Sequence, residues 1–556
     1  MSDTPPTFPL IDEPWLAVLY RTGRQDTVSL KQLFAEASRI RAIVGDLPTQ
    51  TFAILRLLLA VMHRSLEGPA DEREWRQLWQ RPSLPSADID DYLDDFRDRL
   101  DLLHPVTPFY QVADLRTAKE EPAGLQKLIA DVPNGTPYLT SRVGPGLSRI
   151  TPAEAARWLV HCQAYDTSGI KSGAVGDPRV KSGKGYPIGT GWCGNLGGLF
   201  LEADSLRETL LLNLIPQNYL GLAGNDNDLP AWEREPLNAA EEDVRTRGPF
   251  GPLSLYTWQS RRIRLFGDAA TITGALIANG DPLDATDRHH LEPLTGWRRS
   301  ESREKKLKRS PVYVPIRHDP SRALWRGLEA LLPTATTGTS KTGALQLAPT
   351  VTNWLARLRY DEHLPADARI AVRAVGAVYG TQQSVIDQTV DDALIMSVQV
   401  FHPDARLRTL VISSAADAES GVKALRTLAA NLARAAGAKG DAPAKAGSRA
   451  ADAAFAVLDQ QFRRWLASLG PQTDIATARA DWQDTVQHRL RTLAADLISQ
   501  AGPAAWTGRE IGGDKPQFIC ASLAEIWFRR RLNHDLPLAR PSTGDAQTLD
   551  TEEVSA

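Results

Sequence analysis

The fold of this chain is decided by residues 473–501, TDIATARADWQDTVQHRLRTLAADLISQA. Apolar side chains recur in this stretch at intervals of three or four residues: Ile475, Ala478, Trp482, Val486, Leu490, Leu493 and Leu497. Because an α-helix turns once in about 3.6 residues, this spacing places all of them on one face. We therefore predict a long helix that buries one side against other helices.

Similar helical patterns stand on either side of this stretch. Residues 415–437, 448–469 and 519–534 are amphipathic, and the loops between the four segments are short or moderate. The first two carry their apolar stripes on Leu425, Leu428, Leu432 and Ala435, and on Phe455, Leu458, Phe462, Trp465 and Leu469. Four consecutive amphipathic helices favour an all-α four-helix bundle. We assign it to residues 404–536, with a flexible connector at 437–447.

Residues 1–403 have a different pattern, in which short apolar segments alternate with frequent Gly and Pro, without an internal repeat or a βαβ series. This favours an irregular, mixed α+β domain, so the fold class is α+β. Residues 537–556 are polar and acidic, which predicts a disordered tail. Within 1–403 we expect strands at Leu16–Tyr20 and 253–265, helices at 49–66, 72–101, 152–164 and 204–215, and loops at 131–151 and 299–309.

Charge and cysteine content narrow the classes of function. The 556 residues include 64 Lys and Arg against 67 Asp and Glu, a net charge of −3. A strongly basic binder is thereby excluded, so any contact with nucleic acid must use local basic patches. Cys162, Cys193 and Cys520 are far apart and form no CxxC pair, so we expect neither a disulfide framework nor a metal site.

Targeting signals are missing from the sequence as given. The opening MSDTPPTFPLIDEPWL lacks the basic and apolar regions of a signal peptide. The longest apolar run, Phe52–Met62, is interrupted by Arg56 and is too short to cross a bilayer. We expect a cytoplasmic protein that needs no cofactor.

Catalytic motifs are weak. GTSKT at 338–342 is similar to part of a phosphate-binding loop, but Pro333 stands where its first glycine belongs. Asp287, His289 and His290 could form a metal or acid–base site, but no second cluster at ligand spacing accompanies them, and a surface loop is the better interpretation. We predict that the chain is not an enzyme, and an unrecognised hydrolytic site at these three residues is the alternative.

Two regions suit contact with a nucleic-acid backbone. Residues 168–198 combine many glycines, which permit close approach, with cations that can neutralise phosphates: Lys171, Arg179, Lys181 and Lys184. Residues 404–536 contain 18 Lys and Arg against 14 Asp and Glu, whereas the tail contains one Arg and four acids. Lys423, Arg426 and Arg434 lie opposite the leucines of the first bundle helix, forming a basic face. A mobile loop and a solvated helix face are the respective alternatives.

Six segments occur in a characteristic order: LIDEPWL (10–16), HPVTPFYQV (104–112), GIKSG (169–173), LLLNLI (210–215), LYTWQSRRIRL (255–265) and VYGTQQSVID (378–387). Together they resemble the CasA-type large subunit of the type I-E CRISPR Cascade complex. The resemblance spans nearly the whole chain. It implies an irregular α+β domain followed by a four-helix bundle, in agreement with the pattern of the residues.

The resemblance implies a non-catalytic subunit of a crRNA-guided antiviral complex. Such a subunit recognises the protospacer-adjacent motif (PAM) in double-stranded DNA from the minor groove, promotes duplex opening and R-loop formation, and recruits a helicase-nuclease. The implied partners are the other Cascade subunits, the crRNA 5′ handle, the target duplex and the displaced single strand, with no membrane. Base pairing then reads the long sequence, while protein reads a short duplex element. A purely structural scaffold subunit is the alternative.

The family's Gly-rich loop beside the minor groove corresponds to GIKSG, which implies that Ser168, Gly169 and Lys171 lie at the DNA contact. Relatives carry more glycine where this chain has Tyr165 to Ser168, so the preferred motif is expected to differ. The minor groove distinguishes mainly A·T from G·C, so a few contacts can tolerate several motifs.

The family also carries a wedge at a hairpin tip, a glutamine four residues after a tyrosine. Here Gln383 follows Tyr379 at that distance, with Gln382 and Ser384 beside it. Inserting a side chain between base steps costs about a few kcal/mol, which new base pairing can offset. An ordinary solvated hairpin is the alternative.

Three further positions follow from the resemblance. A lysine that reaches into the groove has Arg288 as its counterpart, nine residues before Trp297; the alternative donors are Lys305, Lys306, Lys308 and Arg309. The loop at 131–149 corresponds to a segment that docks toward the crRNA and neighbouring subunits, with Tyr138 or Leu139 as its apolar contact. The cysteine pairs of some relatives are missing, so no structural metal is expected.

Overall fold

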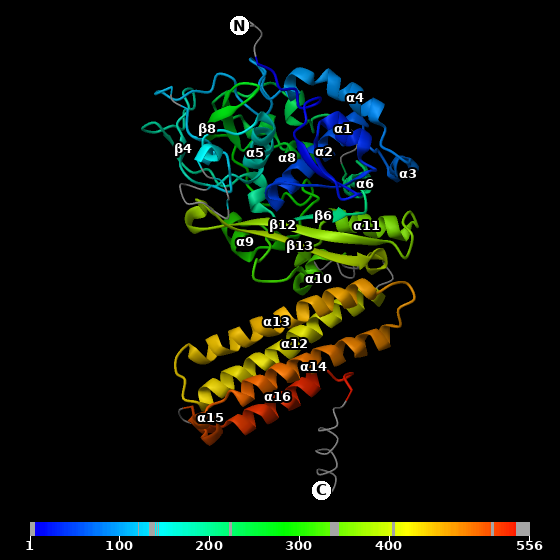
Figure 1. Cartoon of the computed structure of the whole chain (residues 1–556), viewed down its shortest axis with the longest axis vertical. Coiled ribbons are helices and arrows are strands. Elements are labelled where there is room, and N and C mark those ends of the chain that lie inside the picture. Colours follow the sequence, from blue (N-terminus) through cyan, green and yellow to red (C-terminus); the bar gives the residue numbers. More distant parts are fainter. Residues whose placement is uncertain are drawn as a thin grey trace. The chain divides into compact units, whose positions relative to one another are not determined.

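This computed structural model describes residues 6–120, 122–132, 140, 142, 144–221, 225–333, 344–402, 406–512 and 516–540 (Figure 1). The chain forms two compact units. An N-terminal unit comprises Met1–Arg322, Ala330–Leu358 and Ile370–Ala393, and a helical unit comprises Ala323–Glu329, Arg359–Arg369 and Leu394–Ala556. The division at 403/404 that we expect from the sequence stays a prediction, and the tail from 541 onward lies outside the described residues.

The helical unit is built on four long helices that lie side by side (Figure 1). They are α12 (Arg406–Ala435), α13 (Ala442–Ser468), α14 (Ile475–Ser499) and α16 (Ala521–Asp535). The short α15 (Pro503–Thr507) and the hairpin β14 (Arg509–Ile511) and β15 (Gln517–Ile519) lie between the last two in sequence. This confirms the helical C-terminal region that the periodicity predicts.

The middle of the α14 stripe forms the core of the bundle. Trp482, Val486 and Leu490 are buried, and the Trp482 indole donates a 2.8 Å hydrogen bond to the Ser414 carbonyl of α12. The connector predicted at 437–447 is wrong in its second half. Helix α13 already begins at Ala442, because a proline in the first turn of a helix needs no amide hydrogen there and has the helical φ.

A segment remote in sequence also belongs to the helical unit. Trp325 stacks on Phe462 with ring centroids 4.5 Å apart, and its indole donates a 2.9 Å hydrogen bond to Asp459. The side chain of Trp325 is fully buried. Residues 323–329 therefore complete the apolar surface of α13.

The N-terminal unit opens with an antiparallel sheet in the order β2 (Gln25–Val28), β1 (Leu16–Tyr20) and β3 (Ile40–Ile43). The central helix α2 (Pro48–Ser65) is buried around most of its surface. Helices α1 (Leu30–Glu36), α3 (Glu72–Gln80), α4 (Ser86–Asp95), α5 (Pro152–Tyr165) and α6 (Leu206–Asn213) belong to the same unit. Arg56 interrupts the apolar run of α2 because it forms a buried ion pair with Glu292 at 2.8 Å.

Among the described residues, four further small antiparallel sheets lie wholly or mainly in this unit. Their strand orders are β13 (Ile386–Ser397)–β12 (Arg369–Tyr379)–β6 (Gly198–Glu202), β10 (Tyr313–Pro315)–β9 (Trp297–Arg299)–β11 (Gln346–Leu347), β7 (Arg261–Gly267)–β8 (Ile272–Asn279) and β4 (Lys171–Ser172)–β5 (Lys184–Gly185). The mixture of helices and small sheets confirms the α+β class. None of the described helices combines the length and apolarity that a membrane crossing requires.

Two predicted elements are wrong in whole or in part. The strand expected at 253–265 is a short helix, α8 (Pro252–Tyr256), followed by β7 from Arg261. The loop expected at 299–309 contains an exposed helix, α9 (Glu301–Leu307), with acids in its first turn and lysines in its last. That order of charges favours a helix because it opposes the helix dipole.

Candidate nucleic-acid interface

The tip that joins β12 to β13 has an unusual backbone. Gln382 and Gln383 both have a φ of +56°, a left-handed conformation that costs a non-glycine residue about 1–3 kcal/mol. Two hydrogen bonds hold the turn closed: the Gly380 amide donates to the Val385 carbonyl at 3.0 Å, and the Gln383 amide to the Gly380 carbonyl at 2.9 Å. The Gln382 side chain is exposed and that of Gln383 is half-buried.

A loop after α5 carries the motif GIKSG. Its shape depends on the Asp166 carboxylate, which pairs with Lys171 at 2.6 Å and with Arg261 at 2.5 Å. Burial alone would raise the pKa of Asp166, but the charges and hydrogen bonds of the two cations outweigh burial and lower this pKa. The Arg261 guanidinium also donates to the carbonyls of Thr167 and Gly189, at 2.8 and 2.7 Å. Arg261 therefore clamps the loop.

The hairpin tip and this loop are joined directly. The Ser168 amide donates a 2.8 Å hydrogen bond to the Gln383 carbonyl, and the Tyr379 hydroxyl donates one of 2.7 Å to the Tyr165 carbonyl. The two segments line one cavity of about 400 Å³, to which Ser168, Gly169, Lys171, Gln382 and Ser384 all contribute. Two motifs more than 200 residues apart in sequence thus form one site.

The loop residues differ in how they can meet a ligand. Ser168 is buried, and Lys171 is only 9% exposed in its ion pair with Asp166. A Cβ on Gly169 would have its nearest neighbours at 3.9 Å, so sterics inside this chain do not require glycine there. Glycine at 169 is therefore available for an approach from outside.

Arg288 lies apart from this cavity, whose lining residues do not include it. Its guanidinium is half-buried and makes a 3.4 Å hydrogen bond to the Asp284 carbonyl. Burial lowers the pKa of Arg288, while Asp284 and Asp287 act in the opposite direction. The alternative donors Lys305, Lys306, Lys308 and Arg309 are exposed on α9 and just after it. Tyr138 and Leu139 lie outside the described residues.

The other cations of 168–198 divide into two groups. Arg179 is held by Asp177 at 3.0 Å and by Glu241 at 3.0 Å, and also donates to the Gly280 carbonyl. Lys181 and Lys184 are exposed. Arg179 therefore fixes the Gly-rich stretch to the end of β8, while the two lysines are available to attract phosphate.

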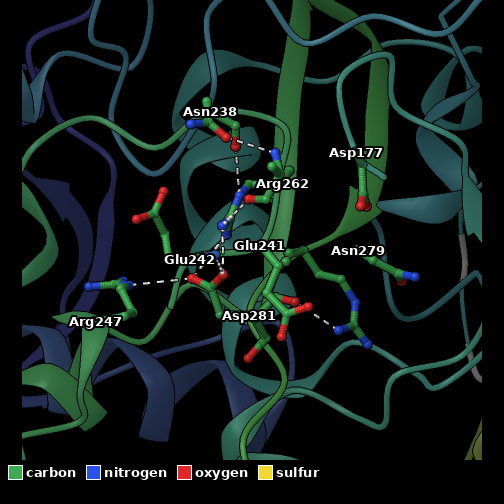
Figure 2. Close-up of polar contacts among 12 residues, drawn as sticks. Asp177, Asn238, Glu241, Glu242, Arg247, Arg262, Asn279 and Asp281 are labelled. Atoms are coloured by element: carbon green, nitrogen blue, oxygen red, sulfur yellow. Dashed lines mark hydrogen bonds and ion pairs between the residues drawn. The ribbon is translucent and has the colours of Figure 1, made fainter. Parts of the chain in front are cut away.

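Next to the end of β8 lies a buried charge network that sequence reasoning missed. Figure 2 shows Asp281 between Arg262 and Arg247, with ion-pair distances of 2.7 and 3.4 Å. Arg262 also donates 2.8 Å hydrogen bonds to the carbonyls of Asn238 and Ala240. The only signal in the sequence is the pair Arg261–Arg262 inside an apolar strand, since buried guanidinium groups need carboxylate or carbonyl partners.

On the helical unit, Lys423 and Arg426 are exposed on α12, as the helical periodicity predicts. Neither has an ion-pair partner among the described residues. Arg434 is half-buried and donates a 2.8 Å hydrogen bond to Asn431. Lys423 and Arg426 are therefore the cations of this face that remain available.

The residues of the alternative hydrolytic site have structural contacts. Asp287 accepts a 2.6 Å hydrogen bond from the Tyr313 amide and pairs with Arg309 at 2.5 Å. The His289 ring packs against Tyr313 with centroids 5.0 Å apart. Burial, and the neighbouring positive charge, lower the pKa of His290. Across the described residues, no group of three or more His, Cys, Asp or Glu side chains is arranged to hold a metal ion.

Comparisons with known proteins agree with this architecture. The family model for CRISPR-associated protein Cse1 matches residues 9–493. The CRISPR-associated protein CasA/Cse1 of Thermus thermophilus is 33% identical over 386 residues, which cover 68% of this chain and 69% of that protein. The crystal structure of Thermobifida fusca Cse1 is 46% identical, with a TM-score of 0.87 over 96% of this chain and 99% of that one.

A chain of a solved CRISPR RNA-guided surveillance complex shares the fold at 17% identity, with a TM-score of 0.64 over 89% of this chain and 100% of that one. This chain belongs to the Cse1/CasA family of large Cascade subunits. The resemblance that the six sequence segments carry is thereby confirmed.

Proposed function

We propose that this chain is the non-catalytic, PAM-reading subunit of a cytoplasmic, crRNA-guided surveillance complex. It recognises a short motif in double-stranded DNA from the minor groove, with the loop around Ser168 and Gly169 against the groove. Gln383, flanked by Gln382 and Ser384, enters the base stack and starts R-loop formation. The other Cascade subunits, the crRNA 5′ handle and a helicase-nuclease are its partners.

One observation carries this proposal: the tip and the loop line the same cavity and share the hydrogen bond between Ser168 and Gln383. A wedge must resist the force that closes the duplex, and unstacking one step costs about a few kcal/mol. The turn contains two left-handed residues and is bonded to a loop that Arg261 holds in place. These constraints make the tip rigid enough to act as a wedge.

Lys171 has a positioning role in this account. Because its ammonium is paired with Asp166 and almost buried, it holds the loop in place instead of neutralising a phosphate. Lys181 and Lys184, which are exposed in the same Gly-rich stretch, supply positive charge toward the DNA backbone. Arg288 and the cluster at 305–309 remain the two candidates for the cation that enters the groove, and Tyr138 or Leu139 for the contact toward the crRNA.

The test uses the reconstituted complex with a library of duplexes that vary at the motif. Gln383→Ala should lower motif-dependent binding about tenfold, which corresponds to about 1.4 kcal/mol. Gln388→Ala, an exposed glutamine on β13, is the matched control and should bind like the wild type. A purely structural scaffold instead predicts equal motif dependence with and without this subunit. If Asp287, His289 and His290 instead form a hydrolytic site, their substitution should abolish hydrolysis and leave duplex binding unchanged.

A further inference from the structure

The hairpin of β4 and β5 carries an exposed apolar pair that the proposed motif reading does not use. Ile170 comes directly before β4, and Tyr186 comes directly after β5. Because Lys171 pairs with Gly185, the antiparallel register places Ile170 opposite Tyr186, with both side chains on one face of the hairpin. Their exposed fractions are 55% and 52%. Two large side chains with apolar bodies therefore lie next to each other in contact with solvent.

The opposite face of the hairpin is fixed to the protein. The Lys171 ammonium pairs there with Asp166 at 2.6 Å. Gly185 is buried against Asn279, where an added Cβ would come within 2.9 Å of the side-chain amide nitrogen. Asn279 also donates a 2.6 Å hydrogen bond to the Tyr186 carbonyl. The backbone beneath the exposed pair is therefore held in place, so binding a ligand costs little conformational freedom of the hairpin.

Lysines accompany the apolar pair on the hairpin. Lys184 lies two residues before Tyr186 and therefore on the same face of β5. Lys181 lies in the turn between the strands, and both lysines are exposed. Neither lysine has an ion-pair partner among the described residues. Free positive charge beside apolar surface suits a ligand in which anionic and apolar groups alternate, as phosphates and deoxyriboses do along DNA.

The pair also adjoins the candidate DNA site. Ile170 lines the cavity of about 400 Å³ together with Gly169 and Gln382. Because Ile170 is also exposed, it lies at the open edge of this cavity. A duplex that meets the hairpin tip of Gln382 would therefore continue onto the face that carries Ile170. This continuity, together with the lysines, favours DNA over a protein subunit as the ligand of the pair.

We propose that Ile170 and Tyr186 seat the sugar–phosphate backbone of the duplex beside the motif. Ile170 packs on a deoxyribose, and the Tyr186 hydroxyl donates a hydrogen bond to a phosphate oxygen. Lys184 neutralises the adjoining phosphate. Such contacts fix the position of the duplex without reading its sequence, so the pair positions the motif for the loop and the tip. The inference rests on the proposed function for the identity of the ligand.

The experiment uses the reconstituted complex and the library of duplexes that vary at the motif, at several salt concentrations. Ile170→Ala and Tyr186→Ala should each weaken binding by about five- to tenfold, by the same factor for every motif. Tyr186→Phe keeps the ring and should lose less. Lys184→Gln should reduce the slope of log affinity against log salt by about one. Val175→Ala, an exposed apolar side chain of the same Gly-rich stretch, is the matched control.

Losses in Ile170→Ala and Tyr186→Ala that do not exceed the loss in Val175→Ala would overturn the inference. A loss confined to particular motifs would also overturn it, since the pair would then read bases. So would impaired assembly of either variant into the complex, measured by size-exclusion chromatography, since the pair would then contact a protein. Gln383→Ala should instead lower the dependence of binding on the motif. A failure of the positioning contact is therefore distinguishable from a failure of motif reading.

Discussion

The backbone amide of Ser168 donates a 2.8 Å hydrogen bond to the carbonyl of Gln383, and this bond links the Gly-rich loop to the hairpin tip. The two residues are 215 positions apart in sequence. Because the bond uses only backbone atoms, it constrains the position of the tip without depending on either side chain. A substitution that displaces the tip should therefore also displace the loop, and the reverse.

Removing this amide should uncouple the two segments. Ser168→Pro lacks the N–H group, so we expect a loss of about 1 kcal/mol in the free energy of unfolding and weaker duplex binding. Ser168→Ala keeps the amide and should unfold like the wild type, so its duplex binding reports the loss of the side chain alone. Chemical denaturation and duplex binding measure the effect, and similar behaviour of the two variants would show that the bond has no role.

The Asp166 carboxylate should be the most sensitive point of the loop. Its two cationic partners are 9% and 1% exposed, so Asp166→Asn leaves buried positive charge unbalanced at a cost of about 3–5 kcal/mol. Asp26→Asn breaks an exposed pair with Arg24 and should cost less than about 1 kcal/mol. Denaturant unfolding compares the two variants. Equal losses in the free energy of unfolding would contradict the role of Asp166 in holding the loop.

The same group predicts a pH dependence. The pKa of Asp166 is lower in the folded chain than its ordinary value, so its ionised form stabilises the fold. This contribution is present above the unfolded pKa, about 3.9, and is lost as the pH falls through the folded value. The wild type should therefore lose more stability than Asp166→Asn on acidification below about pH 4. If the free energy of unfolding falls with pH in parallel for both proteins, ionised Asp166 does not stabilise the fold in this way.

Backbone strain at the tip gives a further prediction. Gln382→Gly should leave the stability unchanged or raise it by up to about 1 kcal/mol, since glycine adopts a φ of +56° without a steric penalty. Gln382→Val should destabilise the protein, since a β-branched side chain is poorly accommodated there. Thermal unfolding distinguishes the variants, and a loss in the glycine variant as large as in the valine variant would argue against strain.

Trp325 tests the membership of residues 323–329 in the helical unit. Because the buried indole stacks on Phe462, Trp325→Ala should cost about 3–5 kcal/mol. Trp506→Ala is the control, since that indole is 47% exposed in the same unit. Denaturation of the helical unit, followed by helical circular dichroism, should shift for Trp325→Ala only. Similar unfolding midpoints for both variants would mean that residues 323–329 add little to the stability of the helical unit.

The helices of the bundle could be predicted from the sequence because each repeats its apolar positions over several turns. Trp482, Val486 and Leu490 are buried as the stripe requires. Short elements are less predictable. The charges of α9 and the proline at the start of α8 favour helices, but a few residues carry too little periodicity to decide between helix, strand and loop.

The candidate site could be located from motifs, but its construction could not. Sequence order does not reveal that Asp166, Lys171 and Arg261 form one cluster. Arg261 reaches the loop because β7 pairs with β8 and because its backbone exchanges hydrogen bonds with the Gln163 side chain of α5. Lys171 looks like a phosphate ligand in sequence and is a buried ion-pair partner in the structure. The contacts that decide such roles are tertiary.

The central claim is that the side chain of Gln383 starts duplex opening at the motif. The most direct measurement places 2-aminopurine at the base step beside the motif and follows its fluorescence when the reconstituted complex binds. The wild type and Gln388→Ala should give a rise in fluorescence that requires the motif, and Gln383→Ala should give little or none. The same motif-dependent rise in Gln383→Ala, with no rise when the whole subunit is left out, would contradict the account.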